Sequence, residues 1–293
     1  MEVELAPGKY VLAVSGGVDS MVLLDLLARK PRVEIVVAHF DHGIRPDSGK
    51  DTLFVEKAAK DYNFPFETGE GRLGSEASEA QARAARYKFL ESVRRKHKAQ
   101  AIITAHHQDD LLETALINIL RGTGPRGLVA IQNNSQIIRP LLGFTKEEIS
   151  MYAKKQHLKW REDSTNAEDN YLRNYLRHKI IPKIDEKQRE QILGNIDKVA
   201  KVGIDQDRIF AILSRQLLKN QQINRLGYIS LPGVVGKETL VQLLRQLDIG
   251  DFDRKTIERL DMALRTAKAG TVVNVVGSTN LNIGKDVASF SLA

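Results

Sequence analysis

Residues 11–20, VLAVSGGVDS, constrain the fold more than any other stretch of this chain. Val11 to Val14 form a short apolar run typical of a buried strand, and Ser15-Gly16-Gly17 interrupt it. From Asp19 onward, apolar residues recur at helical spacing over 22–27. The pattern predicts a strand, a tight glycine turn and a helix. Such a turn directs backbone N–H groups and the positive end of the helix at one point.

A turn of this kind suits a phosphate group. Glycines let the backbone approach an anion closely, and Ser15 and Ser20 carry hydroxyl donors. The carboxylate of Asp19 would be unfavourable beside phosphates alone, which indicates that it holds Mg²⁺. A glycine-rich turn with no ligand is the alternative that the glycines leave open. The string differs from a Walker A loop, which ends in Gly-Lys-Ser/Thr.

Four further segments predict strands, and helical patterns lie between them. The predicted strands are 33–39, 64–67, 101–105 and 137–142, and the predicted helices are 54–62, 77–97, 115–120 and 146–156. Alternation of this kind predicts an α/β fold, a doubly wound and mostly parallel sheet with helices on both faces. Ligands in such sheets bind beyond the carboxyl ends of the strands.

The composition changes near residue 184, which predicts two domains, 1–185 and 190–293. The second domain is expected to be smaller and mostly helical, with helices over 190–218, 237–247 and 254–267. Its end alternates like strands over 271–276, 280–283 and 287–292, which predicts a short antiparallel meander.

Two polar strings follow predicted strands, so they should lie at the ligand-binding edge. The first contains His39, His42 and Arg45, which could meet an anion; hydrogen-bonded structural histidines are the alternative. The second begins a helix and contains Asp110 and Glu113 on one face. A carboxylate pair there could hold an ammonium group or Mg²⁺, or could simply complement the helix dipole.

Arginines and aromatic residues alternate in two places. Arg83, Arg86 and Tyr87 share a helical face, and Trp160 precedes a run that contains Arg173 and Arg177. Rings and guanidinium planes stack on unpaired bases, so both places are candidates for contact with RNA. Ordinary solvated faces are the alternative.

Bulk composition narrows the classes of partner. The net charge is +7 with a pI near 9.4, which favours a polyanionic partner. The 293 residues contain no cysteine, which excludes disulfides, thiolate metal sites and iron–sulfur clusters held by this chain. No apolar run is long enough to cross a bilayer and no basic signal region begins the chain, so we expect a cytoplasmic protein without a membrane partner.

The site strings also occur together and in order. They are Ser15–Ser20, His39–Arg45, the helix from Glu76 to Tyr87, His106–Thr114, Arg121–Leu128, Arg139–Leu142 and Trp160–Arg177. Ser15–Ser20 resembles the pyrophosphate-binding loop of the N-type ATP pyrophosphatases, the PP-loop superfamily. The whole set, over about residues 9–180, resembles the bacterial tRNA(Ile)-lysidine synthases.

The resemblance implies a ligase. Such enzymes use ATP to adenylate C2 of the wobble cytidine in the isoleucine tRNA with a CAU anticodon. Free L-lysine then displaces AMP and gives lysidine. The implied cofactors are ATP and Mg²⁺, and the implied partners are this tRNA and lysine.

The resemblance also implies roles for individual residues. ATP is expected on Ser15, Gly16, Gly17, Val18, Asp19 and Ser20 and on His39, Phe40, Asp41, His42 and Arg45. Mg²⁺ is expected on Asp19, the lysine ammonium on Asp110 and Glu113, and the adenylated cytidine beside Arg86 and Arg121. These five residues are the predicted catalytic set. Contact with tRNA is expected from Arg83, Arg86, Arg126, Trp160, Arg173 and Arg177.

Other functions stay open at this point. A tRNA thiolase or an ammonia-dependent NAD synthetase would use the same loop, although thiolases typically use cysteines. A nucleotide-binding protein without turnover belongs to another class. A homodimer is expected only because it is the commonest oligomer.

Overall fold

The computed structural model describes residues 1–43, 48–71, 79–122, 136–161, 172–250 and 252–292. The chain divides into two compact units, Met1–Asp197 and Lys198–Ala293. None of the helices described is both long and apolar enough to span a membrane.

The first unit contains a five-stranded parallel sheet with the strand order β3-β2-β1-β4-β5. Its strands are β1 (Gly8–Ala13), β2 (Val33–Asp41), β3 (Phe66–Glu70), β4 (Ala101–Ile103) and β5 (Ile137–Ile138). The predicted doubly wound parallel sheet is therefore confirmed. β3 begins after Pro65, later than predicted, because proline has no N–H for the ladder.

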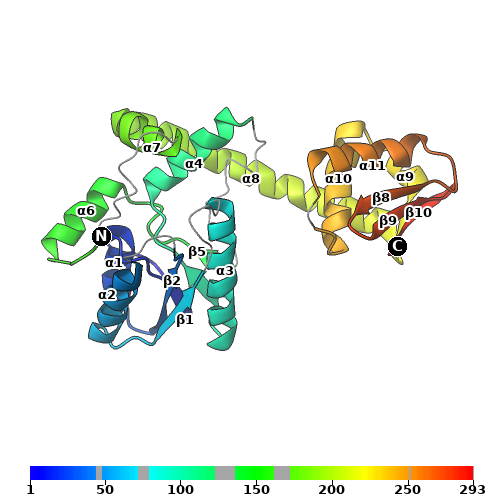
Figure 1. Ribbon diagram of the computed structural model, residues 1–293. Coiled ribbons are helices and arrows are strands. Elements are labelled where there is room, and N and C mark those ends of the chain that lie inside the picture. Colours follow the sequence, from blue (N-terminus) through cyan, green and yellow to red (C-terminus); the bar gives the residue numbers. More distant parts are fainter. Residues whose placement is uncertain (44–47, 72–78, 123–135, 162–171, 251, 293) are drawn as a thin grey trace. The chain divides into compact units, whose positions relative to one another are not determined.

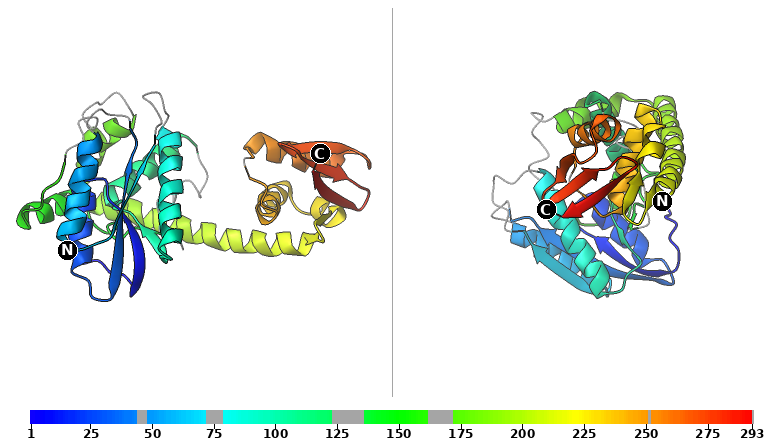
Figure 2. Two further views of the ribbon diagram at one scale, coloured as in Figure 1. Left: turned by 60° about the horizontal axis from the view of Figure 1, so that its bottom comes forward. Right: turned by 90° about the vertical axis from the view of Figure 1, so that its right-hand side faces the viewer.

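Helices cover both faces of this sheet (Figure 1). α1 (Val18–Ala28), α2 (Ser48–Asp61) and α6 (Lys146–Lys155) lie on one side, and α3 (Glu79–Lys96) lies on the other. The other helical elements of the unit are α4 (Gln108–Leu120), α7 (Leu172–Tyr175), the π-helical turn η2 (Leu176–Ile180), the 3₁₀ turn η3 (Ile181–Lys183) and the start of α8 (Glu186–Leu217). Because successive side chains of a strand point to opposite faces of the sheet, the apolar residues form two separate core clusters. Tyr10 and Leu12 pack with α1 and α6, whereas Val11 and Ala13 pack under α3. The left view of Figure 2 shows the sheet between the blue helices α1 and α2 on one side and the cyan helix α3 on the other.

Helix α1 is buried on nearly all sides. Its residues from Ser20 to Leu27 are all buried because the sheet lies on one side and α6 on the other. The side chain of Asp25, on this helix, accepts hydrogen bonds from the hydroxyls of Tyr62 (2.9 Å) and Tyr152 (2.7 Å) and pairs with Arg29. This network fixes α1, and with it the loop that precedes the helix.

The second unit combines helices with an antiparallel sheet of order β6-β7-β10-β9-β8. Besides the end of α8, its elements are β6 (Leu218–Lys219), β7 (Gln222–Asn224), α9 (Arg225–Ile229), α10 (Gly233–Gln246), α11 (Arg254–Thr266), β8 (Val272–Val276), β9 (Thr279–Ile283) and β10 (Val287–Leu292). The predicted meander corresponds to β8–β10. The hairpin of β6 and β7 was not predicted; it turns at Asn220 and Gln221, both with positive φ.

One buried arginine holds the second unit together. Arg225 is 7% exposed, and its guanidinium donates to the carbonyls of Leu264 (2.7 Å), Ala267 (2.6 Å) and Gly284 (2.7 Å). Arg225→Met would leave three carbonyls without this donor, so we expect the free energy of unfolding of the unit to fall by about 3 kcal/mol or more. Amide hydrogen exchange of β8–β10 in the full chain measures this loss.

Arg259→Met is the matched control for this change. Arg259 donates a single bond of 3.3 Å, to the carbonyl of Val275, and we expect a loss below about 1 kcal/mol. Equal protection of β8–β10 in the two variants would contradict the role given to Arg225.

Candidate functional site

The sheet places two of the predicted strings at one point. β1 lies at the centre, β2 pairs on one side of it and β4 on the other, so the chain reverses its direction of winding between β1 and β4. The loop after β1 leads into α1, and the string after β4 leads into α4. His107 joins them: its Nε2 lies 3.8 Å from an oxygen of Asp19 and 3.5 Å from one of Asp110.

The loop before α1 is shaped by its own hydroxyls. Ser20 Oγ accepts from the N–H of Gly16 (3.2 Å) and donates to the carbonyl of Gly17 (2.9 Å). Gly16 has a φ of +91°, which an L side chain rarely adopts. The hydrogen of Ser20 is therefore engaged within the loop, and in this conformation the residue organises the turn. Gly17 caps α1 without a side chain, which leaves the start of the helix suited to an anion.

Asp19 is paired with a residue that the sequence analysis missed. Lys146 Nζ lies 2.6 and 2.8 Å from the two carboxylate oxygens of Asp19. Lys146 is the first residue of α6, where a positive charge opposes the helix dipole. That unfavourable position is the signal that could have identified it.

The carboxylates of Asp110 and Glu113 lie together on α4. Asp110 accepts a hydrogen bond from the backbone N–H of His107 (3.0 Å) and so also caps the helix, as the alternative interpretation expected. Glu113 lies 2.8 Å from Arg173 Nε and 2.8 Å from an Nη of Arg177. Burial raises the pKa of Glu113, while the guanidinium groups of Arg177 and Arg173 oppose that rise.

Arg173 and Arg177 were predicted to contact tRNA. In this structure their guanidinium groups are engaged by Glu113, and Arg177 also approaches Asp110 (3.4 Å). The two arginines, four residues apart, reach the same carboxylate from α7 and η2. The pairing brings this segment to the predicted lysine site, and RNA contact by these arginines stays a prediction.

Several cations line the same edge. Arg139 is 3% exposed, and Tyr87 hydrogen-bonds with it. The guanidinium of Arg83 stacks over the ring of Tyr87 at 5.0 Å. Burial, together with Arg139, Arg86 and Arg83, lowers the pKa of His106 to about 4, so its imidazole is neutral at neutral pH. Because the His106 ring is neutral, the positive charge at this edge of the sheet comes from the arginine guanidinium groups. A cluster of guanidinium groups is suited to binding a polyphosphate.

Residues 39–43, at the end of β2, make several contacts within the protein itself. His39 is buried and its Nδ1 hydrogen-bonds with the carbonyl of Val14 (2.8 Å), directly before the glycine loop. Burial lowers the pKa values of His39 and His42. The ring of Phe40 packs edge-on to that of His42, and Asp41 accepts from the N–H of Gly43 (2.8 Å). His39 therefore supports the loop, as the structural alternative expected.

Some predicted residues lie elsewhere. Arg121 is exposed at the C-terminal end of α4, about 12 Å along the helix from Glu113. The side chain of Trp160 packs against the core of the first unit. The next residue is tied to the glycine loop before α1, because the N–H of Arg161 donates to the carbonyl of Gly16 (3.0 Å). Arg45 and Arg126 lie outside the described residues.

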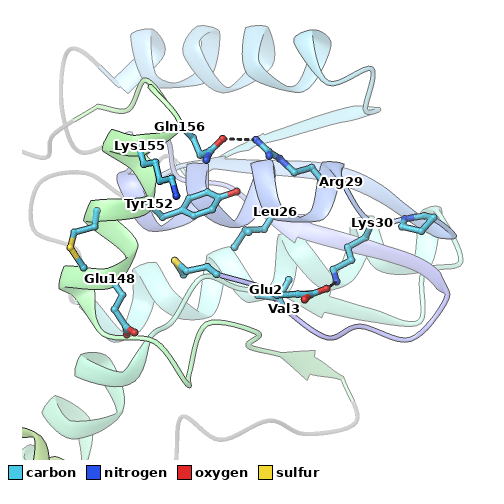
Figure 3. Close-up of a pocket in the computed structure, with 12 residues that line it drawn as sticks. Glu2, Val3, Leu26, Arg29, Lys30, Glu148, Tyr152, Lys155 and Gln156 are labelled. Carbon is cyan, nitrogen blue, oxygen red and sulfur yellow. Dashed lines mark hydrogen bonds and ion pairs between the residues drawn. The ribbon is translucent and has the colours of Figure 1, made fainter.

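The structure also contains a cavity of about 700 Å³ (Figure 3). It is lined by the N-terminal residues, the C-terminal end of α1 and helix α6. Arg29 reaches Gln156 across it (3.0 Å), and Lys30 pairs with Glu2 (2.9 Å). The glycine loop is at the other end of α1, about 16 Å away. None of the predicted site residues that the structure describes lines this cavity.

A family model for the PP-loop domain matches residues 3–184. The chain belongs to the PP-loop domain family. Within this family, the chain is 42% identical over 193 residues to the tRNA(Ile)-lysidine synthase of Thermotoga maritima. The aligned region covers 62% of the chain and 47% of that protein. It is 38% identical over 274 residues to the synthase of Actinobacillus pleuropneumoniae serotype 3, covering 84% of the chain and 64% of that protein. The chain thus spans about half to two thirds of the length of these relatives.

A solved structure shares the fold of this PP-loop protein. The U34-tRNA thiolase NcsA of Methanococcus maripaludis, with its [4Fe-4S] cluster, aligns with a TM-score of 0.54 at 16% identity. The alignment covers 68% of this chain and 73% of the thiolase. The present sequence has no cysteine with which to hold a cluster of that kind.

Proposed function

We propose that this PP-loop protein is a tRNA(Ile)-lysidine synthase. It joins free lysine to C2 of the wobble cytidine in the isoleucine tRNA with a CAU anticodon, at the expense of ATP. The main support for the proposal is that a loop suited to phosphate and a pair of carboxylates suited to an ammonium group lie at the same edge of the sheet. A phosphate-type loop at the start of α1 lies beside a carboxylate pair on α4, and His107 links Asp19 to Asp110.

The proposed reaction has two steps. The C2 oxygen of cytidine attacks the α-phosphorus of ATP, and pyrophosphate leaves with the electrons of the broken P–O bond. The ε-amine of lysine then attacks C2, the C2–O bond breaks, and AMP leaves with that oxygen. The loop at Ser15–Ser20 and the N-terminus of α1 would hold the phosphates, and Arg86 and Arg139 would balance the developing charge.

Mg²⁺ belongs to the proposal as part of the nucleotide complex. Within the described residues, no group of three or more His, Asp or Glu side chains is arranged to hold a metal ion by itself. Asp19 alone fits the way Mg²⁺ is usually bound, by one or two carboxylates with the phosphates and water. When bound there, the ion would neutralise charge on the departing pyrophosphate. Lys146 would have to release Asp19, and its ammonium would then lie beside the phosphates.

The second unit completes the proposal. We assign the predicted domain 190–293, which contains this unit, to contact with the tRNA, in keeping with the basic charge of the chain. Lysine, ATP and tRNA are all cytoplasmic, so we place the reaction in the cytoplasm. A homodimer stays a prediction from the frequency of dimers.

The test is pyrophosphate release from ATP by the full chain. Lysine and transcribed isoleucine tRNA are added separately and together. We expect release that requires the CAU-anticodon tRNA, and a mass gain on that RNA only when lysine is present. Release with a different acceptor would contradict the proposed substrate, and no release under any condition would contradict the proposed reaction.

A further inference from the structure

A segment that follows α6 holds the glycine loop before α1 from outside. The backbone N–H of Arg161 donates to the carbonyl of Gly16 (3.0 Å). The guanidinium of Arg161 pairs with Asp51, in the first turn of α2, and the preceding residue, Trp160, packs against the core of the first unit. We call Asp51, Trp160 and Arg161 the loop tie. These residues connect α2 and the core to the glycine loop.

The hydrogen bond from Arg161 fixes the orientation of one peptide group in the loop. In a trans peptide the C=O and the N–H point in opposite directions. The carbonyl of Gly16 and the N–H of Gly17 belong to the same peptide, so a carbonyl that faces Arg161 turns this N–H away from the loop tie. The N–H of Gly17 is directed at the hydroxyl of Ser15, which lies 3.3 Å from that of Ser20. It therefore lies on the hydroxyl side of the loop.

The N–H of Gly17 is open to a ligand. Its distance to Ser15 Oγ is 3.4 Å, longer than a well-formed N–H···O bond, and this contact is exposed. A Cβ at Gly17 would meet only Ser15 Oγ within 4 Å. Gly17 is also the N-cap of α1, where the first N–H groups of the helix have no partner within it. An anion at this point gains one further donor from Gly17.

Two consecutive glycines also make the opposite orientation of this peptide accessible. Glycine adopts positive and negative φ with similar ease, so the peptide between Gly16 and Gly17 rotates at little steric cost. Rotation would turn a carbonyl oxygen toward the phosphates, which repels them. A side chain cannot restrict the rotation, because Gly16 has a φ of +91° and a Cβ there would lie 3.4 Å from Val55 and 3.5 Å from Phe54. The restriction has to come from outside the loop.

We propose that the loop tie is a positioning element for ATP. The N–H of Arg161 holds the peptide between Gly16 and Gly17 so that the N–H of Gly17 faces the phosphate chain. The ion pair of Arg161 with Asp51 keeps this donor in place. Arg161 acts through Gly17 and touches no nucleotide, so it is a positioning residue. The inference rests on the phosphate-binding part of the proposed function and deepens it.

Three variants separate the backbone of Arg161 from its side chain. Arg161→Gln removes the guanidinium and keeps the N–H, whereas Arg161→Pro removes both. Lys159→Pro is the control, a proline in the same segment at an exposed residue. Within the part of the chain that the structure describes, the N–H of Lys159 donates to no backbone carbonyl.

Calorimetric titration of the full chain with ATP, inorganic pyrophosphate and adenosine measures the effect. We expect Arg161→Pro to weaken ATP and pyrophosphate about tenfold or more, the loss expected for one hydrogen bond to a charged group, with adenosine unchanged. Arg161→Gln should stay within about threefold of wild type, because an ion pair with a side chain 38% exposed contributes little. Lys159→Pro should match wild type. Equal affinities of Arg161→Pro and Arg161→Gln for pyrophosphate, or an equal loss of adenosine, would overturn the inference.

Hydrogen exchange of the unaltered chain provides a test that needs no proline variant. If pyrophosphate binds only the tied orientation, it must stabilise the hydrogen bond from Arg161 to Gly16 by linkage. We expect the amide of Arg161 to exchange up to about 10²-fold more slowly at a pyrophosphate concentration near 100 times Kd. The amide of Leu158, which donates to the carbonyl of Ala153 (3.0 Å), is the control and should not change. Unchanged exchange at Arg161 would overturn the inference.

Pyrophosphate release with tRNA separates this inference from the proposed function. Release by the wild type, together with equal ATP affinities of Arg161→Pro and Arg161→Gln, would overturn the inference and support the proposed function. Absence of release under any condition, together with slower exchange at Arg161 when pyrophosphate is bound, would overturn the proposed function and support the inference.

Discussion

Glu113→Gln is expected to lower lysidine formation by about 10²-fold, while tRNA-dependent pyrophosphate release stays within about twofold of wild type. The substitution keeps the shape of the side chain and removes its charge. An ammonium then loses a charge-assisted bond worth up to about 3 kcal/mol, which corresponds to about 10²-fold. Glu113 is 4% exposed, so water replaces little of that interaction. Separate assays of pyrophosphate and of RNA mass measure the two steps.

Asp109→Asn is the control on the same helix. Asp109 pairs with Arg189 Nη1 (2.5 Å), which also donates to Gln108 (3.2 Å), so its carboxylate joins α4 to the start of α8. We expect a loss of stability with the KM for lysine unchanged. Equal lysine dependence in Glu113→Gln and wild type would remove the carboxylate pair from the site.

Asp19→Asn is expected to lower pyrophosphate release by about 10²- to 10³-fold. A charged group aimed at developing charge in a preorganised site typically contributes this much. Asp19 stands in the first turn of α1 beside the glycine loop, where its carboxylate would hold Mg²⁺ and the ion would supply positive charge for the phosphates. A titration of Mg²⁺ at fixed ATP should show that the variant needs more of the ion.

Two variants identify the origin of that loss. Asp25→Asn removes a carboxylate two turns later on α1, where it is bound to Tyr62 and Tyr152, and should affect stability while sparing the use of ATP. Lys146→Met removes the partner of Asp19 and should raise the KM for ATP about tenfold, as expected for one charge-assisted bond to phosphate. Normal release by Asp19→Asn would exclude a metal role for Asp19.

The local sequence carries much of this fold. The apolar runs around residues 11–14, 33–39 and 101–103 lie as parallel strands, and the glycine turn at Gly16 has the positive φ that glycine allows. Thr145 and Glu148 form a capping box at the start of α6, a pair three residues apart that marks a helix start in the sequence. These features depend on neighbours a few residues apart, so their pattern can be read directly from the chain.

Long-range pairing is harder to predict. The hairpin at Asn220–Gln221 was missed because its strands are short and follow a long helix without a break in polarity. Trp160 was assigned to RNA because aromatic residues beside arginines suit stacking; its side chain is partly buried against the core, and contact with RNA stays a prediction. Composition cannot distinguish these outcomes, since either environment accepts the same ring.

The sequence by itself determined that a phosphate-type loop and a carboxylate pair follow two strands of a parallel sheet. Only the tertiary structure decided which cations meet them. Lys146 reaches Asp19 across 127 positions of the chain, and Arg177 reaches Glu113 across 64. Such ion pairs leave no periodic pattern, because the strand order and the packing of α4, α6 and α7 bring the charges together. The burial of these ion pairs then determines how strong they are, since the attraction between opposite charges grows as water is excluded.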